Sequence, residues 1–238
     1  MPTRAPSRAA QQRAAHVAAK QAAAAARRRR RVVLSAVLAT LAVAAVVGIV
    51  VGTRSGSGPV SSTPAGVTAA GGVLVGSSSA PVKVIAYEDL QCPVCGRFER
   101  QSGVLLKQAV AAGKVSVEYR IRSFLGPESV RAANGLGAAQ AEGKFEALRE
   151  ALYSEQPAEG TGGYSVDTLI STGRDVGLAS SSYADAVRSG RYDAWVRATD
   201  DRASRDGNVQ TPELRVAGRA LTQAELFDAA ALSAALGI

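Results

Sequence analysis

The chain has two cysteines, Cys92 and Cys95, which stand three residues apart in the stretch EDLQCPVCGRFER. Such a pair serves as a structural staple, as half of a metal site or as a redox centre. Zinc needs four ligands, and the chain offers no third cysteine and only one histidine, His16, in its N-terminal tail. We therefore expect no metal site and weigh the two remaining interpretations.

A disulfide between residues three apart closes a very small loop, so as a staple it removes little entropy from the unfolded chain. The redox interpretation explains both spacing and placement. Cys92 follows an apolar run and begins an expected helix, where free backbone N–H groups favour a thiolate. Pro93 suits the first helical position. Cys95, one turn later, is placed to attack a mixed disulfide, and a low pKa makes Cys92 a good leaving group.

The surrounding pattern predicts an α/β domain with a helical insertion. We expect an edge strand at 71–76, a buried strand at 82–88, a helix at 93–112 and a strand at 114–122. Helices are expected at 127–143, 144–155, 165–177, 180–190 and 191–207, then a strand at 213–218 and a short strand from 219. A final helix is expected from Thr222, with Glu225 at the spacing of a capping box.

Other side chains are assigned to packing or to the surface. Phe98 and Leu105 are expected to pack the helix at 93–112 against the sheet, with Val104 and Leu106 as further candidates. Three charged residues of this helix are expected to face solvent: Arg97, Glu99 and Arg100. Three aromatic residues of the insertion fit a core better than a site: Tyr183, Tyr192 and Trp195.

The N-terminal region predicts a membrane anchor. Residues 32–52 carry no charge and as a helix would span about 31 Å, close to the hydrocarbon thickness of a bilayer. Five arginines precede this segment, which places residues 1–31 in the cytoplasm and the C-terminal part outside. A cleaved signal peptide is the alternative, but the segment is long and lacks a clear cleavage site. Residues 53–70 read as a flexible tether, and residues 71–238 as the folded domain.

The net charge of +8 belongs to the N-terminal tail. Residues 1–31 hold nine of the 28 basic residues and no acid, which leaves 19 basic against 20 acidic residues in the remainder. A nearly neutral domain argues against nucleic acid as its partner. The tail itself fits a topology determinant attracted to anionic lipid.

Three stretches together resemble the DsbA-like branch of the thioredoxin superfamily: APVKVIAYEDLQCPVCGRFE, GKVSVEYRIRSFLGPESVRAANGLGAA and NVQTPELRVAGRAL. With the insertion between them they cover about residues 71–236. The resemblance implies a thioredoxin-like fold with a helical insertion, here preceded by one transmembrane helix. It also implies a cis Thr211–Pro212 bond lying against both cysteines. The expected substrate-binding residues are Pro93, Val94, Thr211 and Pro212.

Two positions depart from that family pattern. Six residues before the first cysteine the family usually has a buried acid, and this chain has Ala86, with Glu88 and Asp89 at other spacings. The missing acid bears on the rate and on the resolving step. Glu213 and Arg215 follow the Thr-Pro pair, where they fit either an altered substrate surface or an exposed edge with opposite charges.

The resemblance and the anchor together imply a membrane-anchored thiol:disulfide oxidoreductase that acts on exported proteins through Cys92 and Cys95. A disulfide oxidase is favoured, with the cysteine pair as its redox group, no other cofactor, and a membrane partner that restores the disulfide. A monomer is the default. A reductase or isomerase using the same residues is the near alternative, and a non-catalytic, membrane-tethered binding domain is the distant one.

Overall fold

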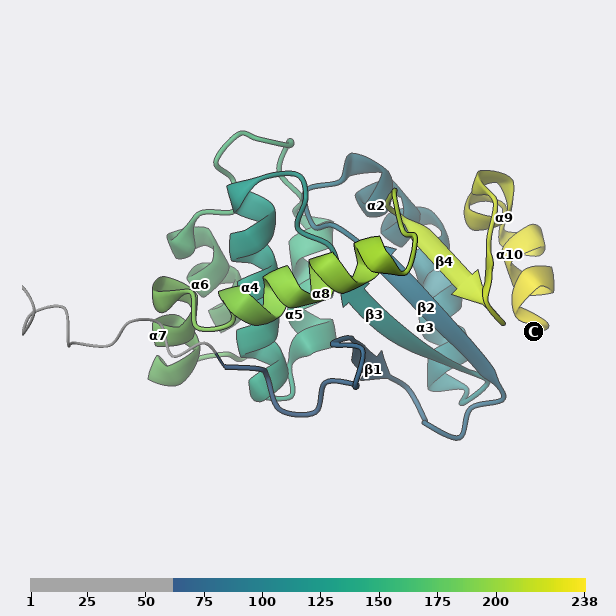
Figure 1. Ribbon diagram of the computed structural model, residues 1–238, viewed down its shortest axis with the longest axis horizontal. Helices are drawn as coiled ribbons and strands as arrows, with labels where there is room; N and C mark the ends of the chain where they lie inside the picture. The colour runs from purple at the N-terminus through teal and green to yellow at the C-terminus, as the bar shows by residue number, and fades with distance from the viewer. Residues whose placement is uncertain (1–61) are drawn as a thin grey trace, which may run out of the picture. The chain divides into compact units, whose positions relative to one another are not determined.

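The computed structural model describes residues 62–238, which form an α/β domain around one five-stranded sheet (Figure 1). The sheet order is β1-β3-β2-β4-β5, with β2 and β3 parallel and the other neighbours antiparallel. The strands are β1 (Val73–Val75), β2 (Val82–Glu88), β3 (Val115–Ile121), β4 (Glu213–Val216) and β5 (Arg219–Ala220). The predicted α/β class is confirmed, and β2 has the predicted bounds.

Strand β2 is central because its sequence is apolar on both faces, as a strand covered on both sides requires. Its residues Ala86 and Tyr87 are fully buried. The parallel register pairs Val84 with Val117, and the antiparallel register pairs Tyr87 with Glu213. The carboxyl end of β2 therefore meets the beginning of β4 at one end of the sheet.

Helices cover both faces of the sheet (Figure 1). Helix α8 crosses one face, the segment α2–η1–α3 lies on the other, and α9 with α10 stands beyond β4. The first segment comprises α2 (Pro93–Phe98), η1 (Glu99–Gly103) and α3 (Val104–Ala111). The insertion comprises α4 (Pro127–Ala141), α5 (Phe145–Ser154), α6 (Val166–Asp175), α7 (Ser181–Ser189) and α8 (Asp193–Arg205). The last two helices are α9 (Gln223–Phe227) and α10 (Ala229–Leu236).

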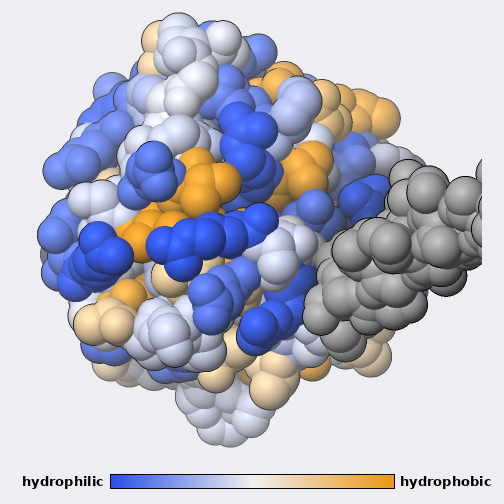
Figure 2. All heavy atoms as spheres, turned by 90° about the vertical axis from the view of Figure 1, so that its left-hand side faces the viewer, coloured by the Kyte–Doolittle hydropathy of each residue, from blue (hydrophilic) through white to orange (hydrophobic). Residues whose placement is uncertain are grey.

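The five predicted insertion helices are all present. Tyr183, Tyr192 and Trp195 are buried among them, which confirms that they are core residues. The side of the molecule that carries α6 and α7 shows small hydrophobic groups separated by hydrophilic residues (Figure 2). Each of these two helices buries one face and exposes the other, as the buried residues Leu169 and Ile170 of α6 and Tyr183 and Val187 of α7 show.

The helix predicted at 93–112 is interrupted by η1, a π-helical turn. A π turn holds one more residue than an α turn, so it shifts the buried face of the following helix by one position. Phe98 and Leu106 are therefore the buried pair, whereas Leu105 is half-buried and Val104 is 54% exposed. The prediction was right for Phe98 and gave Leu105 more weight than its burial supports.

The final helix also divides in two. Asp228 has extended backbone angles (φ −108°, ψ 120°), and its side chain accepts a hydrogen bond from the N–H of Ala231, so it caps α10. The predicted capping box of Thr222 and Glu225 is present at the start of α9. Side-chain capping thus sets the start of both helices.

The predicted basic tail (1–31) and apolar segment (32–52) lie outside the described residues. Between residues 62 and 238, no helix is both long and apolar enough to cross a membrane. Residues 62–70, assigned to the tether from sequence, contact the domain. The N–H of Ser62 donates to the carbonyl of Arg191, and Nε2 of Gln140 donates to the carbonyl of Ala65.

Candidate active site

The two cysteines lie at the junction of β2 and α2, as predicted. Cys92 is the extended residue that precedes α2, and Pro93 occupies the first turn. The N–H of Cys92 donates to the carbonyl of Asp89 at 2.9 Å, which closes the turn between strand and helix. Both cysteines are free thiols. Cys92 is 7% exposed and Cys95 is fully buried, so Cys92 is the sulfur that a partner can reach.

The pKa values of the two thiols are displaced in opposite directions. The pKa of Cys92 is lowered to about 6, mainly because its sulfur accepts a hydrogen bond from Cys95. A hydrogen bond with Thr211 and the backbone N–H groups of Cys95 and Val94 add to this effect, against the opposing effect of burial. The pKa of Cys95 is raised well above its usual value by burial and by the hydrogen bond that its thiol makes to Cys92. At neutral pH the pair therefore holds a thiolate at Cys92 and a thiol at Cys95.

We expect alkylation of the reduced protein by iodoacetamide to reach half its maximal rate near pH 6, since only the thiolate reacts. Cys95→Ala should move this midpoint upward, because it removes the largest stabilising hydrogen bond. Cys95→Ser, which keeps a donor, should move it less. Alkylation rates measured between pH 4 and pH 9 check this, and equal midpoints for the three proteins would contradict the assigned cause.

The loop before β4 brings Thr211 and Pro212 to the cysteines, as the family resemblance implied. The Thr211–Pro212 bond is cis, and Sγ of Cys92 lies 3.4 Å from the carbonyl oxygen of Thr211. Arg122 holds this loop, since its Nη1 donates to the carbonyl of Asn208 at 2.9 Å. Of the predicted substrate-binding residues, Pro93 is exposed, Val94 and Thr211 are half-buried, and Pro212 is buried.

Glu213 and Arg215 do not form an exposed edge, because β4 lies between β2 and β5. Glu213 is buried and pairs with Arg215 at 2.5 Å. The guanidinium of Arg215 lies 5.1 Å from the centre of the Tyr87 ring. Of the two alternatives, the exposed edge is thus wrong, because Arg215 pairs with β5 and Glu213 is buried.

A buried acid is present close to the cysteines, although Ala86 occupies the position where the family usually has one. Glu88 is fully buried and accepts two hydrogen bonds of 2.9 Å from Arg149 of α5. Ala86 and Glu88 point to the same face of β2, because side chains alternate along a strand. The acid has therefore moved two residues along that face, and the sequence comparison missed it.

Arg149 joins Glu88 to a second carboxylate, Glu99 of η1, with which it also pairs. Burial raises the pKa of Glu88 to about 8, Arg149 opposes this shift and Glu99 adds to it. Glu99 was expected to face solvent, but the π turn directs it toward Arg149. A Cβ on Gly103 would lie 2.9 Å from a Glu99 carboxylate oxygen, so glycine leaves the room that this orientation needs.

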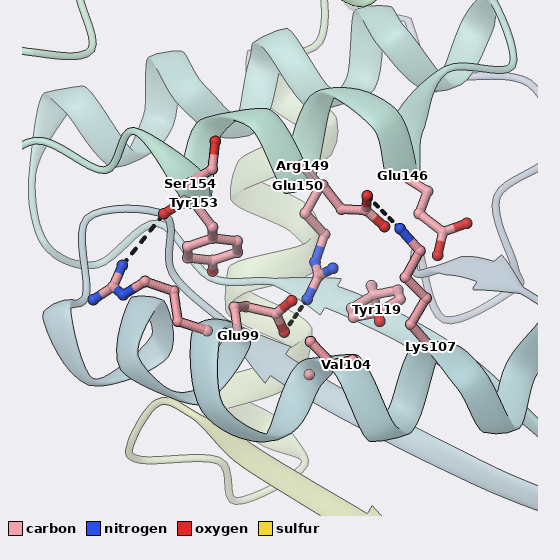
Figure 3. A pocket seen from close by; sticks show the side chains of 11 residues that line it. Glu99, Val104, Lys107, Tyr119, Glu146, Arg149, Glu150, Tyr153 and Ser154 are labelled. Carbon is pink, nitrogen blue, oxygen red and sulfur yellow. Dashed lines mark hydrogen bonds and ion pairs between the residues drawn. The ribbon is translucent and has the colours of Figure 1, made fainter.

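The Glu99 end of this charged cluster reaches a pocket of about 190 Å³ between η1, α3 and α5 (Figure 3). Arg149 points from α5 toward Glu99, and Lys107 pairs with Glu150 at 2.6 Å farther along the pocket (Figure 3). The hydroxyl of Tyr153, which also lines the pocket, is buried and has no hydrogen-bond partner among the described residues. The buried pair of Glu88 and Arg149 thus adjoins space accessible to water.

Asp89 orders the turn that leads to Cys92. Its carboxylate accepts hydrogen bonds from Ser129 (2.6 Å), from the N–H of Gln91 (2.9 Å) and from the N–H of Leu125 (3.3 Å). Burial raises its pKa to about 6 against these donors. The spacing of the motif identified Asp89 from the sequence. It did not indicate that Ser129 and Arg149, which belong to the insertion, contact the acids before Cys92.

An accessible thiolate that lies beside a buried thiol and faces a Thr-Pro loop is the site of a thiol:disulfide oxidoreductase. A family model described as Thioredoxin matches residues 68–236, and the chain belongs to this family, as a DsbA-like member. A search of curated proteins found no match.

Three solved structures illustrate the similarity. Reduced DsbG of Mycobacterium tuberculosis is 29% identical, with 69% of this chain and 85% of that chain covered and a TM-score of 0.60. Oxidised DsbA of the same organism is 29% identical, covering 69% and 90%, also with a TM-score of 0.60. MdbA, a thiol-disulfide oxidoreductase of Actinomyces oris, shares the fold at 18% identity, covering 78% and 95%, with a TM-score of 0.65.

Proposed function

We propose that the chain is a membrane-anchored disulfide oxidase that acts on exported proteins, with Cys92 as the substrate-facing sulfur and Cys95 as the resolving one. The observation that carries this proposal is the contrast between the two thiols. Cys92 has a lowered pKa and lies against the Thr211 carbonyl, whereas Cys95 is buried with a raised pKa. Thiol–disulfide exchange needs this division between an outer and an inner sulfur.

In the oxidase direction, a substrate thiolate attacks Sγ of Cys92 in the Cys92–Cys95 disulfide. The S–S bond breaks, and Cys95 leaves as a thiolate that takes up a proton, for which Glu88 is the nearby buried acid. A second substrate thiolate then attacks the substrate sulfur of the mixed disulfide and expels the Cys92 thiolate. The substrate loses two electrons and the cysteine pair gains them, so an electron acceptor must restore the disulfide. We assign that role to a membrane partner.

The lowered pKa of Cys92 favours the oxidase over the reductase. Stabilising the thiolate stabilises the reduced protein, which makes its disulfide a stronger oxidant. We expect the reduction potential, measured by equilibration with glutathione and thiol trapping, to lie near about −120 mV. A value near about −270 mV would assign the reductase function instead.

Placement outside the membrane is supported by residues 32–52 and by the arginines before them. In intact cells, a membrane-impermeant maleimide should label reduced Cys92, and the protein should sediment with membranes. Deleting residues 32–52 should release it from the membrane fraction. Labelling that requires cell lysis would contradict the proposed orientation.

A further inference from the structure

The loop between α5 and α6 contacts the peptide backbone that leads into the active site. Nε2 of Gln156 donates to the carbonyl of Leu90 at 2.8 Å and to that of Cys92 at 2.9 Å. The hydroxyl of Tyr164 also donates to the Leu90 carbonyl, at 3.1 Å, and the N–H of Gly160 donates to Oε1 of Gln91 at 3.0 Å. Leu90, Gln91 and Cys92 are buried, so these bonds satisfy polar groups that water reaches poorly.

Gly96 provides the space that the Gln156 amide occupies. A Cβ added to Gly96 would overlap Oε1 of Gln156 and would lie 2.7 Å from its Cδ. Glycine is unfavourable inside a helix, and Gly96 lies inside α2 directly after Cys95. Close approach of the amide accounts for a glycine at this position. Gly96 and Gln156 are thus complementary, although 60 positions separate them in the sequence.

The contact bears on the reacting sulfur through the backbone. The carbonyl of Cys92 accepts the N–H of Gly96 at 3.1 Å, the bond that begins α2, as well as the Gln156 amide. Fixing this carbonyl fixes the peptides that follow, and with them the N–H groups of Val94 and Cys95 that face Sγ of Cys92. We propose that Gln156 is a positioning residue for thiol–disulfide exchange, which holds the start of α2 so that its N–H groups stabilise the Cys92 thiolate.

The test uses the full chain in detergent and compares Gln156→Ala, Gly96→Ala and the double variant. We expect Gln156→Ala to raise the alkylation midpoint of Cys92 by about half a pKa unit, which is about a twofold loss of thiolate at pH 6. The disulfide should become correspondingly less oxidising. Gly96→Ala should give the same shift by displacing the amide. In the double variant the two shifts should not add, because both changes remove one interaction.

Gln140→Ala is the matched control, since it removes a glutamine-to-carbonyl hydrogen bond, to Ala65, away from the cysteines. It should leave the midpoint unchanged. A lower melting temperature without a shifted midpoint in both single variants would overturn the proposal, as would additive shifts. Should Gln156→Ala fail to fold, Gly96→Ala decides, because it keeps the glutamine. The proposal rests on the site assigned above, but these readouts need no protein substrate. A wild-type protein that is inactive on substrates would therefore refute the proposed function separately.

Discussion

Cys92→Ser is expected to abolish disulfide exchange, with a loss of about 1,000-fold or more in the rate of oxidation of a reduced substrate protein. The chain has no third cysteine to replace it, and the buried Cys95 is both inaccessible and protonated. Refolding of reduced ribonuclease, with insulin reduction as the reverse assay, measures this loss. Equal rates for wild type and variant would instead support a non-catalytic binding domain.

Cys95→Ser supplies the complementary result. Cys92 remains able to form a mixed disulfide, but no inner thiol is left to resolve it. The variant should therefore accumulate covalent complexes with substrate proteins that disappear on treatment with dithiothreitol. If the covalent complexes accumulate with the Cys92→Ser variant and not with the Cys95→Ser variant, the assigned roles of the two sulfurs would be reversed.

Arg149→Met is expected to destabilise the protein by about 3–5 kcal/mol at pH 7, because it removes the guanidinium that donates hydrogen bonds to buried Glu88 and pairs with Glu99. Methionine keeps much of the side-chain volume, so loss of charge dominates. Lys107→Met is the matched control, since it breaks an exposed pair with Glu150 and should cost no more than about 1 kcal/mol. Urea denaturation measures both changes. Similar losses for the two variants would contradict the importance of the buried cluster.

The same cluster predicts the direction of the pH dependence. Glu88 has a folded-state pKa of about 8 against an ordinary value of 4.5, so between these values the folded protein binds more protons than the unfolded one. Its contribution to stability is therefore present below about pH 4.5 and is lost as the pH rises toward 8. In Arg149→Met the loss should be larger, because Arg149 no longer opposes the rise in the pKa of Glu88. Denaturation curves at pH 5 and pH 8 test this.

Local pattern predicted the strands, the insertion helices and the cysteine junction, because alternation, capping residues and glycine act over a few positions. It failed where the result depends on the π turn, which moved the buried position from Leu105 to Leu106 and turned Glu99 inward. No short-range signal marks a π turn within an otherwise helical sequence. Comparison by distance from the first cysteine likewise missed Glu88, because that comparison tests only the position of Ala86.

The contacts that the helical insertion makes with the active site could not be predicted from the sequence. Arg149 and Gln156 act on residues about 60 positions away, and such pairings follow from tertiary packing alone. The alternation of β2 did carry a usable signal for Glu88, since a shift of two residues keeps a side chain on the same face. A buried charged residue should therefore be sought at every position on the same face of the strand, and not only at a fixed distance from the cysteine motif.

Because β2 and β4 pair in a fixed antiparallel register, the position of the Thr211 carbonyl depends on the number of residues between it and the start of β4. Tyr87 pairs with Glu213, and the Thr211 carbonyl that contacts Cys92 stands only two residues upstream of Glu213. One added or removed residue would move that carbonyl by about 3.3 Å along the strand direction, about the length of the contact itself. Homologous chains should therefore vary more in the composition of this segment than in its length.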